Sequence, residues 1–363
     1  MLHCACTQRQ GGATVKALVK FARGPEGVAL RELPEPVPAE GELKVKVLAA
    51  SVCGSDIHAV NDERVTVMPV VLGHEYVGQV VETRGDVQDF QIGDWVMTLP
   101  ACYSCGTCSL CRQGLVTLCR DRRSIGFHVN GTIAEYLTVP ARYSFRLPPE
   151  ARTLEDRLPY ALTEPLACVV RGVYEKIQVK PGDTVMVSGP GVMGQFASQV
   201  FKTRGAYVIL SGLPQDREKL ALAKSLGADE IVDSPQALTE AVYSRSPMGA
   251  DITCDATGVP ASLETCMKAI RPLGIHLQLG MFGGAVPFRP DSIFDREVTY
   301  VPSNSTAVTT WPITLDLLAR KQVTMSPFLS MRLPLEEWRT AFDAVIHKQV
   351  YKALLLPDNH FSS

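Results

Sequence analysis

The spacing of hydrophobic positions divides the chain into two parts with different periodic patterns. In the first part, short apolar runs are separated by Gly and Pro, which is typical of β-strands and turns. Pro34, Pro36 and Pro38 mark one connecting loop, and Gly93-Asp94 predicts a tight turn. The pattern predicts strands over residues 15–21, 42–50, 70–83, 94–99 and 135–139.

From about Tyr160 onward, strand-like and helix-like segments alternate, and such alternation builds a parallel, doubly wound sheet. After about Tyr300 the spacing favours two further helices, over residues 311–320 and 335–347. The fold class is therefore α/β, with a β-rich part beside a doubly wound part. The expected strands are 184–188, 206–211, 251–255 and 275–279, and the expected helices are 165–176, 195–202, 216–226 and 261–270.

Composition narrows the class of protein. The chain has 363 residues, of which 46% are hydrophobic and 20% charged, as in a globular protein of two domains. A net charge of -2 without a basic run argues against nucleic acid as a partner, and no apolar run is long enough to span a bilayer. Residues 1–14 lack the apolar segment of a secretory signal, so we expect a flexible tail in which Cys4 and Cys6 have no partner pattern. The eleven cysteines fit the reducing cytoplasm better than a disulfide-rich secreted protein.

Four cysteines gather in one short stretch, at Cys105, Cys108, Cys111 and Cys119. Two Cys-x-x-Cys steps share a middle cysteine, which brings several sulfurs near one point. Zinc prefers four sulfur ligands in a closed structural site. Buried thiols or disulfide bonds are the alternative, although adjacent short spacings suit a metal better than bridges. We therefore expect a lobe at about residues 100–122 that is folded around zinc.

A second candidate metal set combines Cys53 with His74 and Glu75, and another carboxylate stands at Glu164. Catalytic zinc sites use three protein ligands and leave the fourth position open. Each residue alone has an ordinary explanation, Cys53 as a core residue and the others as satisfied polar groups. Because the same chain carries a sulfur cluster and a nucleotide motif, a catalytic metal site is the better interpretation.

The nucleotide motif is a Gly-x-Gly-x-x-Gly pattern formed by Gly189, Gly191, Val192, Met193 and Gly194. The first glycine permits a tight turn, the second lets the backbone approach a pyrophosphate, and the third allows close helix packing. An ordinary glycine turn is the alternative, but here a strand-like segment precedes the pattern and a helix-like segment follows it.

Together these motifs resemble the zinc-dependent medium-chain dehydrogenases of the alcohol dehydrogenase superfamily, and within them the polyol (sorbitol) and threonine dehydrogenase branch. The resemblance covers residues 15–356 and rests on Cys53 to His58, Gly73 to Glu75, the four-cysteine lobe, Glu164-Pro165-Leu166 and the glycine loop. It implies a GroES-like catalytic domain over 15–160, a Rossmann domain over 161–300, and a return of 301–363 to the catalytic domain.

The resemblance also implies roles around Cys53. Ser55 and His58 would relay the alcohol proton through the cofactor ribose to solvent, which suits the histidine pKa of about 6.5. Asp56 would orient His74, as metal-bound imidazoles usually require. A surface histidine and a turn-capping aspartate are the alternatives. Glu75 and Glu164 can trade the metal position with water, and the sequence does not decide between them. Two zinc ions per chain, one catalytic and one structural, are expected.

Other positions fall where the family contacts its ligands. Phe127 and His128 correspond to the substrate pocket of the polyol branch, although Phe127 fits an apolar core equally well. Thr257, Leu279 and Met281 correspond to cofactor contacts.

The chain departs from both branches. Sorbitol dehydrogenases carry an Arg-Tyr pair where this chain reads Pro302-Ser303-Asn304, and threonine dehydrogenases carry a Trp-rich loop where residues 59–68 contain no Trp. We therefore expect a secondary alcohol of the polyol, sugar-acid or cyclitol type as substrate.

The end of the second Rossmann strand bears on the choice of cofactor. NAD-specific domains place an Asp or Glu there, about 20 residues beyond the glycines. This chain reads Ser211-Gly212 instead, and Arg217 begins the next helix beside the counter-charge of Asp216. Ser211 and Arg217 would contact a 2′-phosphate, so we expect NADP to serve at least as well as NAD. A simple turn glycine at Gly212 is the alternative.

The sequence thus predicts a zinc-dependent oxidoreductase that transfers a hydride between a small-molecule alcohol or ketone and NAD(P). We expect it in the cytoplasm as a homo-oligomer, a dimer or tetramer. A reductase of the same superfamily without catalytic zinc is one alternative, which the presence of Cys53, His74 and Glu75 disfavours. A non-enzymatic zinc- and nucleotide-binding regulator is the other, which the Ser55 and His58 pair disfavours.

Overall fold

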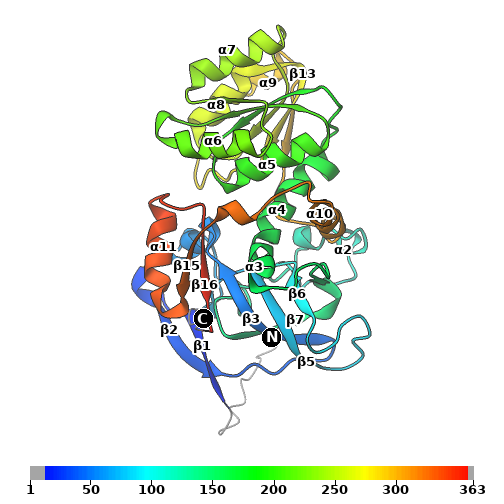
Figure 1. Cartoon of the computed structure of the whole chain (residues 1–363), viewed down its shortest axis with the longest axis vertical. Helices are drawn as coiled ribbons and strands as arrows, with labels where there is room; N and C mark the ends of the chain where they lie inside the picture. Colours follow the sequence, from blue (N-terminus) through cyan, green and yellow to red (C-terminus); the bar gives the residue numbers. More distant parts are fainter. Residues whose placement is uncertain (1–12, 359–363) are drawn as a thin grey trace.

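The computed structural model describes residues 13–358 and shows a parallel-sheet part above a β-rich part (Figure 1). The expectations for residues 1–12, with Cys4 and Cys6, and for residues 359–363 lie outside the described residues. The first strand begins at Thr14, the last residue of the expected tail. Among the described residues, no helix is long and apolar enough to cross a membrane.

The upper part is a six-stranded sheet in which every neighbouring pair is parallel. Its order, β11-β10-β9-β12-β13-β14, is that of a dinucleotide-binding Rossmann sheet. All residues of the central β9 are buried, because helices cover both faces of the sheet. The strands are β9 (Thr184–Ser188), β10 (Tyr207–Ser211), β11 (Glu230–Val232), β12 (Ala250–Asp255), β13 (Ile270–Gln278) and β14 (Thr299–Pro302).

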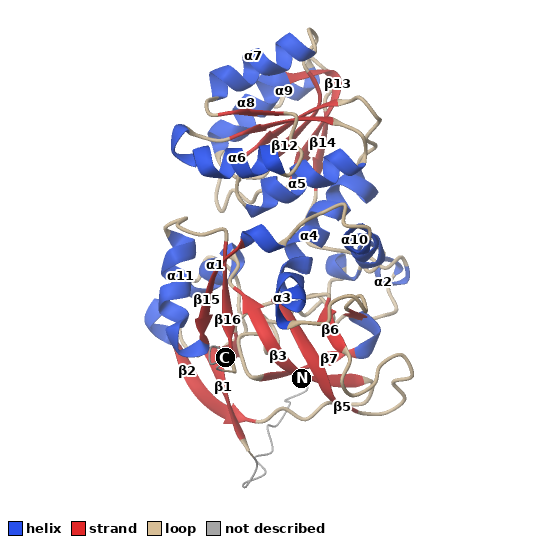
Figure 2. Ribbon diagram, viewed as in Figure 1, coloured by secondary structure: helices blue, strands red, loops and turns tan. Residues whose placement is uncertain are grey.

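Helices flank this sheet on both sides (Figure 2). One of them, α7, was not predicted, although its start carries readable signals. Pro235 occupies its first position, and the Ser234 hydroxyl accepts from the Ala237 N–H at 3.1 Å, as an N-cap does. The helices are α5 (Val192–Thr203), α6 (Arg217–Ser225), α7 (Pro235–Arg245), α8 (Pro260–Ala269) and α9 (Asp291–Phe294).

The lower part holds a seven-stranded sheet and a three-stranded antiparallel sheet. The C-terminal segment joins the larger sheet, because β16 pairs with β3 at Leu354–Ser51 and Leu355–Ala50. The strands of the larger sheet are β3 (Glu42–Ser51), β5 (Glu75–Thr83), β6 (Trp95–Thr98), β7 (Tyr136–Pro140), β8 (Ser144–Arg146), β15 (Leu329–Pro334) and β16 (Lys352–Leu356). Those of the smaller sheet are β1 (Thr14–Lys20), β2 (Val28–Pro34) and β4 (Val70–Val71).

The strand expected over residues 70–83 is in fact two strands, β4 and β5. Gly73 breaks it with a φ of 92°, and a Cβ there would lie 2.5 Å from Cγ1 of Ile133. Only glycine fits this turn, which places His74 and Glu75 at the start of β5.

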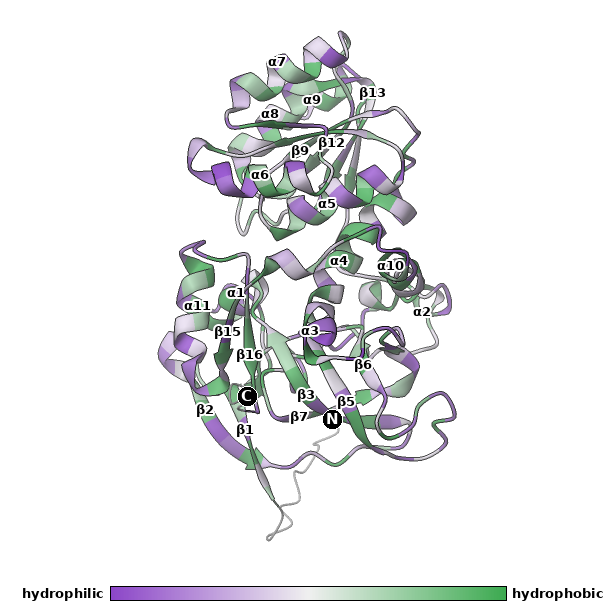
Figure 3. Ribbon diagram, in the orientation of Figure 1, coloured by the Kyte–Doolittle hydropathy of each residue, from purple (hydrophilic) through white to green (hydrophobic). Residues whose placement is uncertain are grey.

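Hydrophobic residues fill the centres of both parts, whereas hydrophilic positions gather on outer helices such as α6 (Figure 3). Phe328 joins the two parts, because its ring packs edge-on against those of Phe196 and Tyr351 at 5.1 and 5.2 Å. The expected helix over 165–176 is α-helical only in its first half and continues as a π-helix to Lys176. The remaining helices are α1 (Gly54–Val60), α2 (Ser109–Arg112), α3 (Leu154–Arg157), α4 (Thr163–Val170), α10 (Thr310–Ala319) and α11 (Trp338–Ile346).

Candidate functional site

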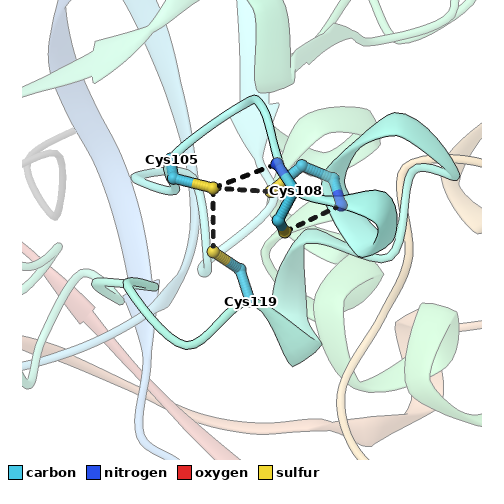
Figure 4. Close-up of side chains that lie close together, drawn as sticks. Cys105, Cys108 and Cys119 are labelled. Atoms are coloured by element: carbon cyan, nitrogen blue, oxygen red, sulfur yellow. Dashed lines mark hydrogen bonds between the residues drawn. The ribbon is translucent and has the colours of Figure 1, made fainter.

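Cys105, Cys108 and Cys119 point toward one another around α2 (Figure 4), and the ligand atoms of these three cysteines and Cys111 lie within 4.8 Å of one another. The sulfur of Cys105 lies 3.8 Å from that of Cys111 and 3.6 Å from that of Cys119. Two sulfurs that each lie about 2.3 Å from a tetrahedral zinc ion are about 3.8 Å apart. Disulfide sulfurs would be about 2.0 Å apart, so the spacing suits a metal and excludes bridges.

Backbone amides stabilise the thiolate form of Cys105 in this cluster. The N–H groups of Cys108 and Thr107 lower the pKa of Cys105 to about 6, and the Cys108 N–H lies 3.4 Å from the sulfur. A thiolate is the form that binds metal, so Cys105 is ready to bind near neutral pH. The donor set of four sulfurs fits a structural zinc ion.

Cys53, His74 and Glu75 form the second cluster, and their ligand atoms lie within 4.8 Å of one another. Cys53 stands between the end of β3 and the start of α1, and Glu75 pairs with Ser51 across β3 and β5. Two adjacent antiparallel strands therefore bring these distant residues together. A sulfur, an imidazole and a carboxylate are the donors of a catalytic zinc site.

Asp56, fully buried in α1, holds two of these ligands. One carboxylate oxygen lies 3.1 Å from Nδ1 of His74, and the other accepts from the backbone N–H of Cys53 at 3.0 Å. Burial acts to lower the pKa of His74, but the charges of Asp56 and Cys53 outweigh it and raise that pKa well above its usual value. Since Nδ1 is engaged, Nε2 is the nitrogen left to bind a metal.

Lys352 is a member of the site that the sequence did not reveal. Its Nζ lies 2.7 Å from both carboxylate oxygens of Glu75, and both side chains are buried. Burial acts to lower the pKa of Lys352, but the charge of Glu75 outweighs it and raises the pKa. The one signal was a charged residue at the head of the apolar strand β16.

Glu164 lies in α4, nearly buried and outside the three-residue cluster. Burial raises its pKa, the charge of His74 opposes this, and the charge of Glu75 adds to it. Its Oε1 lies 3.5 Å from the sulfur of Cys168, one helical turn further on. Both carboxylates are therefore close enough to influence each other and His74.

Ser55 and His58 are three residues apart in α1 and therefore lie on the same face of the helix. Both are half-buried. Nδ1 of His58 lies 2.5 Å from Oε2 of Glu63, a residue that sequence reasoning did not consider. The bond leaves Nε2 of His58 as the nitrogen that can exchange a proton with a neighbour.

Phe127 is buried in the core, and its ring centre is 5.1 Å from that of His74. Both interpretations of Phe127 are therefore compatible with its position, since a core side chain also borders the cluster. His128 follows it and is half-buried.

The glycine loop joins β9 to α5, whose N-cap is Gly191. A Cβ on Gly194 would lie 1.8 Å from the carbonyl oxygen of Gly189, so this close crossing requires glycine. A Cβ on Gly191 would meet nothing within 4 Å, which leaves open space at the helix N-terminus. Val192 and Met193 begin the helix there, half-buried. This cradle fits the pyrophosphate of a dinucleotide.

Ser211 ends β10 and is buried, with its hydroxyl 3.4 Å from the carbonyl oxygen of Val187. A Cβ on Gly212 would lie 2.9 Å from Cγ of Pro190, so the glycine loop itself leaves little room for a side chain. Asp216 is engaged by Lys219 at 3.4 Å, whereas Arg217 is exposed.

The other expected cofactor positions lie at the carboxyl ends of β12 and β13. Asp255 fixes this edge, because it accepts from the N–H and the hydroxyl of Thr257 at 2.9 and 2.7 Å. The N–H of Leu279 donates to the carbonyl of Asp255 at 3.0 Å, and Met281 is 59% exposed. Ligands of such sheets bind beyond the carboxyl ends of the strands.

Comparison with known proteins gives matches over most of the chain. The model of the alcohol dehydrogenase GroES-like domain matches residues 39–149, and that of the zinc-binding dehydrogenase matches residues 192–320. D-arabitol-phosphate dehydrogenase of Enterococcus avium is 35% identical over 94% of this chain and 97% of its own length. Sorbitol dehydrogenase of Halalkalibacterium halodurans is 33% identical over 94% and 99%.

Comparison with solved structures also finds dehydrogenases of similar fold. A putative zinc-binding dehydrogenase from Sinorhizobium meliloti, bound to NADP, has a TM-score of 0.84 and 32% identity, covering 95% of this chain and 100% of its own. An alcohol dehydrogenase from Thermus sp. ATN1 has a TM-score of 0.81 and 30% identity, covering 94% and 99%.

Proposed function

Because this chain belongs to the zinc-binding dehydrogenase family, we propose that it oxidises a secondary alcohol of the polyol, sugar-acid or cyclitol type at the cluster of Cys53, His74 and a carboxylate. The chain is a zinc-dependent oxidoreductase that transfers a hydride between an alcohol and NAD(P). The observation that carries the proposal is the buried three-donor cluster within 4.8 Å, held by Asp56. A zinc ion there supplies Lewis acidity toward the substrate oxygen, and NAD(P) supplies the hydride acceptor.

The surrounding residues orient the ligands and exclude water. Asp56 fixes the ring of His74 and the backbone of Cys53, so two ligands keep one geometry. The buried ring of Phe127 covers one side of His74. We propose two zinc ions per chain, the second at the four-cysteine cluster, because both donor sets are complete.

Glu75 and Glu164 compete for the third position in this proposal. Glu75 lies in the cluster, but Lys352 engages both of its oxygens. Glu164 is the carboxylate without such a cation, and burial already disfavours its charge. Metal analysis of Glu75→Gln and Glu164→Gln, each against wild type, identifies the carboxylate whose loss releases one equivalent of zinc.

The proton path that we propose runs along one face of α1, from Ser55 to His58. Glu63 holds Nδ1 of His58, so Nε2 accepts the proton and passes it to solvent. His58→Ala should slow turnover by about 10²–10⁴, the usual contribution of a general base, and should leave metal and cofactor binding intact.

The matched control is the exposed His347→Ala, which lies far along the chain in the turn after α11. Turnover of His58→Ala that equals wild type at every pH would remove His58 from the mechanism.

For the cofactor, we propose that NADP serves at least as well as NAD. Gly212 rather than a carboxylate comes directly after β10, Asp216 further on is paired with Lys219, and Arg217 is exposed at the start of α6. The similar structure from Sinorhizobium meliloti is bound to NADP. The buried Ser211 hydroxyl contributes less than expected in this arrangement, because it faces Val187.

The ratio of kcat/KM for the two cofactors tests this choice. Arg217→Ala should lower the value for NADP and leave that for NAD nearly unchanged. A wild-type preference for NAD of more than about tenfold contradicts the proposal. Gly212→Asp is a poor test, because its Cβ would press on Pro190.

We further propose a cytoplasmic homo-oligomer. The nine cysteines of the described residues are free thiols, as in a reducing compartment. Strand β14 ends the six-stranded sheet, and Phe294 and Leu273 near it are 78% and 63% exposed. An open edge with exposed apolar residues suits a second copy of the chain. Light scattering of the purified protein, with Phe294→Asp beside wild type, tests the assembly.

Two measurements separate this function from its alternatives. A panel of polyols, sugar acids and cyclitols is assayed with NAD and NADP at alkaline pH, and zinc is counted in the same preparation. Oxidation that disappears with the second zinc equivalent supports the proposal. Activity without catalytic zinc would favour a zinc-independent reductase, and no activity with any substrate would favour a binding protein.

A further inference from the structure

An arginine stacks on the aromatic ring that borders the metal cluster. Arg64 lies on the loop after α1, half-buried, with its guanidinium carbon 3.9 Å from the centre of the Phe127 ring. That ring is itself 5.1 Å from the ring of His74. The same aromatic ring therefore lies next to both the cation and a proposed metal ligand.

The backbone fixes Arg64 in this place. Its N–H donates to the carbonyl of His58 at 3.1 Å. Further along the loop, the N–H of Val67 donates to the carbonyl of Phe127 at 2.7 Å. The loop is thus tied both to the proposed relay histidine and to the aromatic residue that borders the cluster.

The neighbouring carboxylates are occupied elsewhere. Asp62 is paired with Lys20 at 2.9 Å, and Glu63 is bonded to His58. Within residues 13–358, Arg64 forms no ion pair. A half-buried guanidinium has lost part of its hydration, and without an anionic partner no ion pair offsets that loss. A ligand anion would therefore be stabilised beside it.

Two more groups can donate hydrogen bonds to an anion, and one of them carries a positive charge. Arg122 is half-buried, and its guanidinium donates only to the carbonyl of Thr117 in the described part of the chain. His128 accepts from the Ser124 N–H at Nδ1, 3.3 Å away, which leaves Nε2–H as a free donor. Burial, followed by the charges of Arg122 and Arg64, lowers the pKa of His128 and keeps it neutral.

We propose that Arg64, Arg122 and His128 form an anion subsite at the far end of the substrate pocket, and that the alcohol oxidised here carries a phosphate group. The inference rests on the proposed function, because it extends the same pocket. The planar guanidinium fork matches phosphate oxygens bidentately, and imidazole N–H adds a third donor. The similar enzyme of Enterococcus avium is named for a phosphorylated polyol.

The test compares kcat/KM for D-arabitol phosphate and D-arabitol with the full-length, zinc-loaded protein. We expect wild type to prefer the phosphate by about 10²-fold, since hydrogen bonds to charged groups are stronger than those between neutral groups. Arg64→Ala should lower this preference at least about tenfold, mainly through KM, and Arg64→Lys should lower it less.

Arg31→Ala is the matched control. It removes another stacked arginine, whose guanidinium carbon lies 3.5 Å from the Phe21 ring beside β2, away from the cluster. Its preference should equal that of wild type. If Arg64→Ala does not fold, Arg122→Ala tests the same subsite independently.

The outcomes separate the subsite from the proposed function. A wild type that prefers neutral arabitol, or Arg64 variants that keep the full preference, would overturn the subsite and leave polyol oxidation standing. If neither alcohol is oxidised, calorimetry decides: tighter, Arg64-dependent binding of arabitol phosphate supports the subsite, and equal binding overturns it. An aldonate that binds more tightly than the phosphate would overturn the choice of phosphate over carboxylate.

Discussion

The two candidate metal clusters of this chain are built in opposite ways. The four-cysteine cluster takes every ligand from one loop around α2, and its residues range from exposed to buried. The Cys53 cluster takes its ligands from the adjoining ends of two neighbouring strands, β3 and β5, and buries two of them. Its support comes from further away still, because Lys352 belongs to β16 at the end of the chain.

The four-cysteine cluster can form locally and help its loop to fold, whereas the Cys53 cluster forms only when distant elements of the fold have come together. A local cluster of thiolates with all four positions filled can contribute folding energy and has no position for substrate. A three-donor cluster leaves one position open, and its buried charges depend on partners from distant elements. Mutations should therefore divide into losses of stability and losses of turnover.

The largest effect that this comparison predicts is on turnover. Cys53→Ser removes a ligand of the open cluster and should lower kcat more than about 10³-fold, since Lewis-acid stabilisation amounts to several kcal/mol. The melting temperature should change little. Metal analysis should fall from about two zinc equivalents to about one; a count that stays unchanged would contradict the catalytic site.

At the four-cysteine cluster, Cys111→Ser should reduce stability more than turnover. It should lower the free energy of unfolding by several kcal/mol, because metal binding there is folding energy. Urea denaturation beside zinc analysis measures it. The control is Cys102→Ala, a buried thiol close to the lobe that belongs to neither cluster, which should keep both metals. Equal stability of both variants would break the distinction between the clusters.

Lys352→Met tests the dependence of the open cluster on distant charge. It leaves Glu75 buried without a cation and should cost about 3–5 kcal/mol of stability. The double variant Lys352→Met/Glu75→Gln should regain part of this loss, since no unpaired charge remains. Urea unfolding of both variants provides the values, and a double variant no more stable than the single one argues against the pairing.

The smallest predicted effect concerns the residue that orients His74. Asp56→Asn keeps the size of the side chain but weakens its hold on Nδ1, and should lower zinc affinity at the open cluster by about 10–100-fold. Competition with a chelator measures this affinity. Retention of the structural zinc in the same titration is the internal control.

Sequence patterns predicted correctly those features that are formed by residues close together in the chain. The spacing of the four cysteines predicts their cluster, and the glycine pattern predicts the β9–α5 turn, where Gly194 meets the nearby backbone of Gly189 and Gly191 faces open space. The core of the Rossmann sheet was also readable, with β9 predicted at its true bounds. Strands β14, β15 and β16 were among those missed, because strands of four to six residues carry weak periodic signals.

At the active site the sequence determined which donors are available, and the tertiary structure decided how they are held. Cys53, His74, Glu75 and Glu164 could be named from residue type and order. That Lys352 neutralises Glu75, that Glu63 holds His58, and that Arg64 covers Phe127 follow from packing alone. The physical reason is clearest for Lys352 and Glu75, because the sheet brings together two residues 277 positions apart, and no local spacing encodes such a pair.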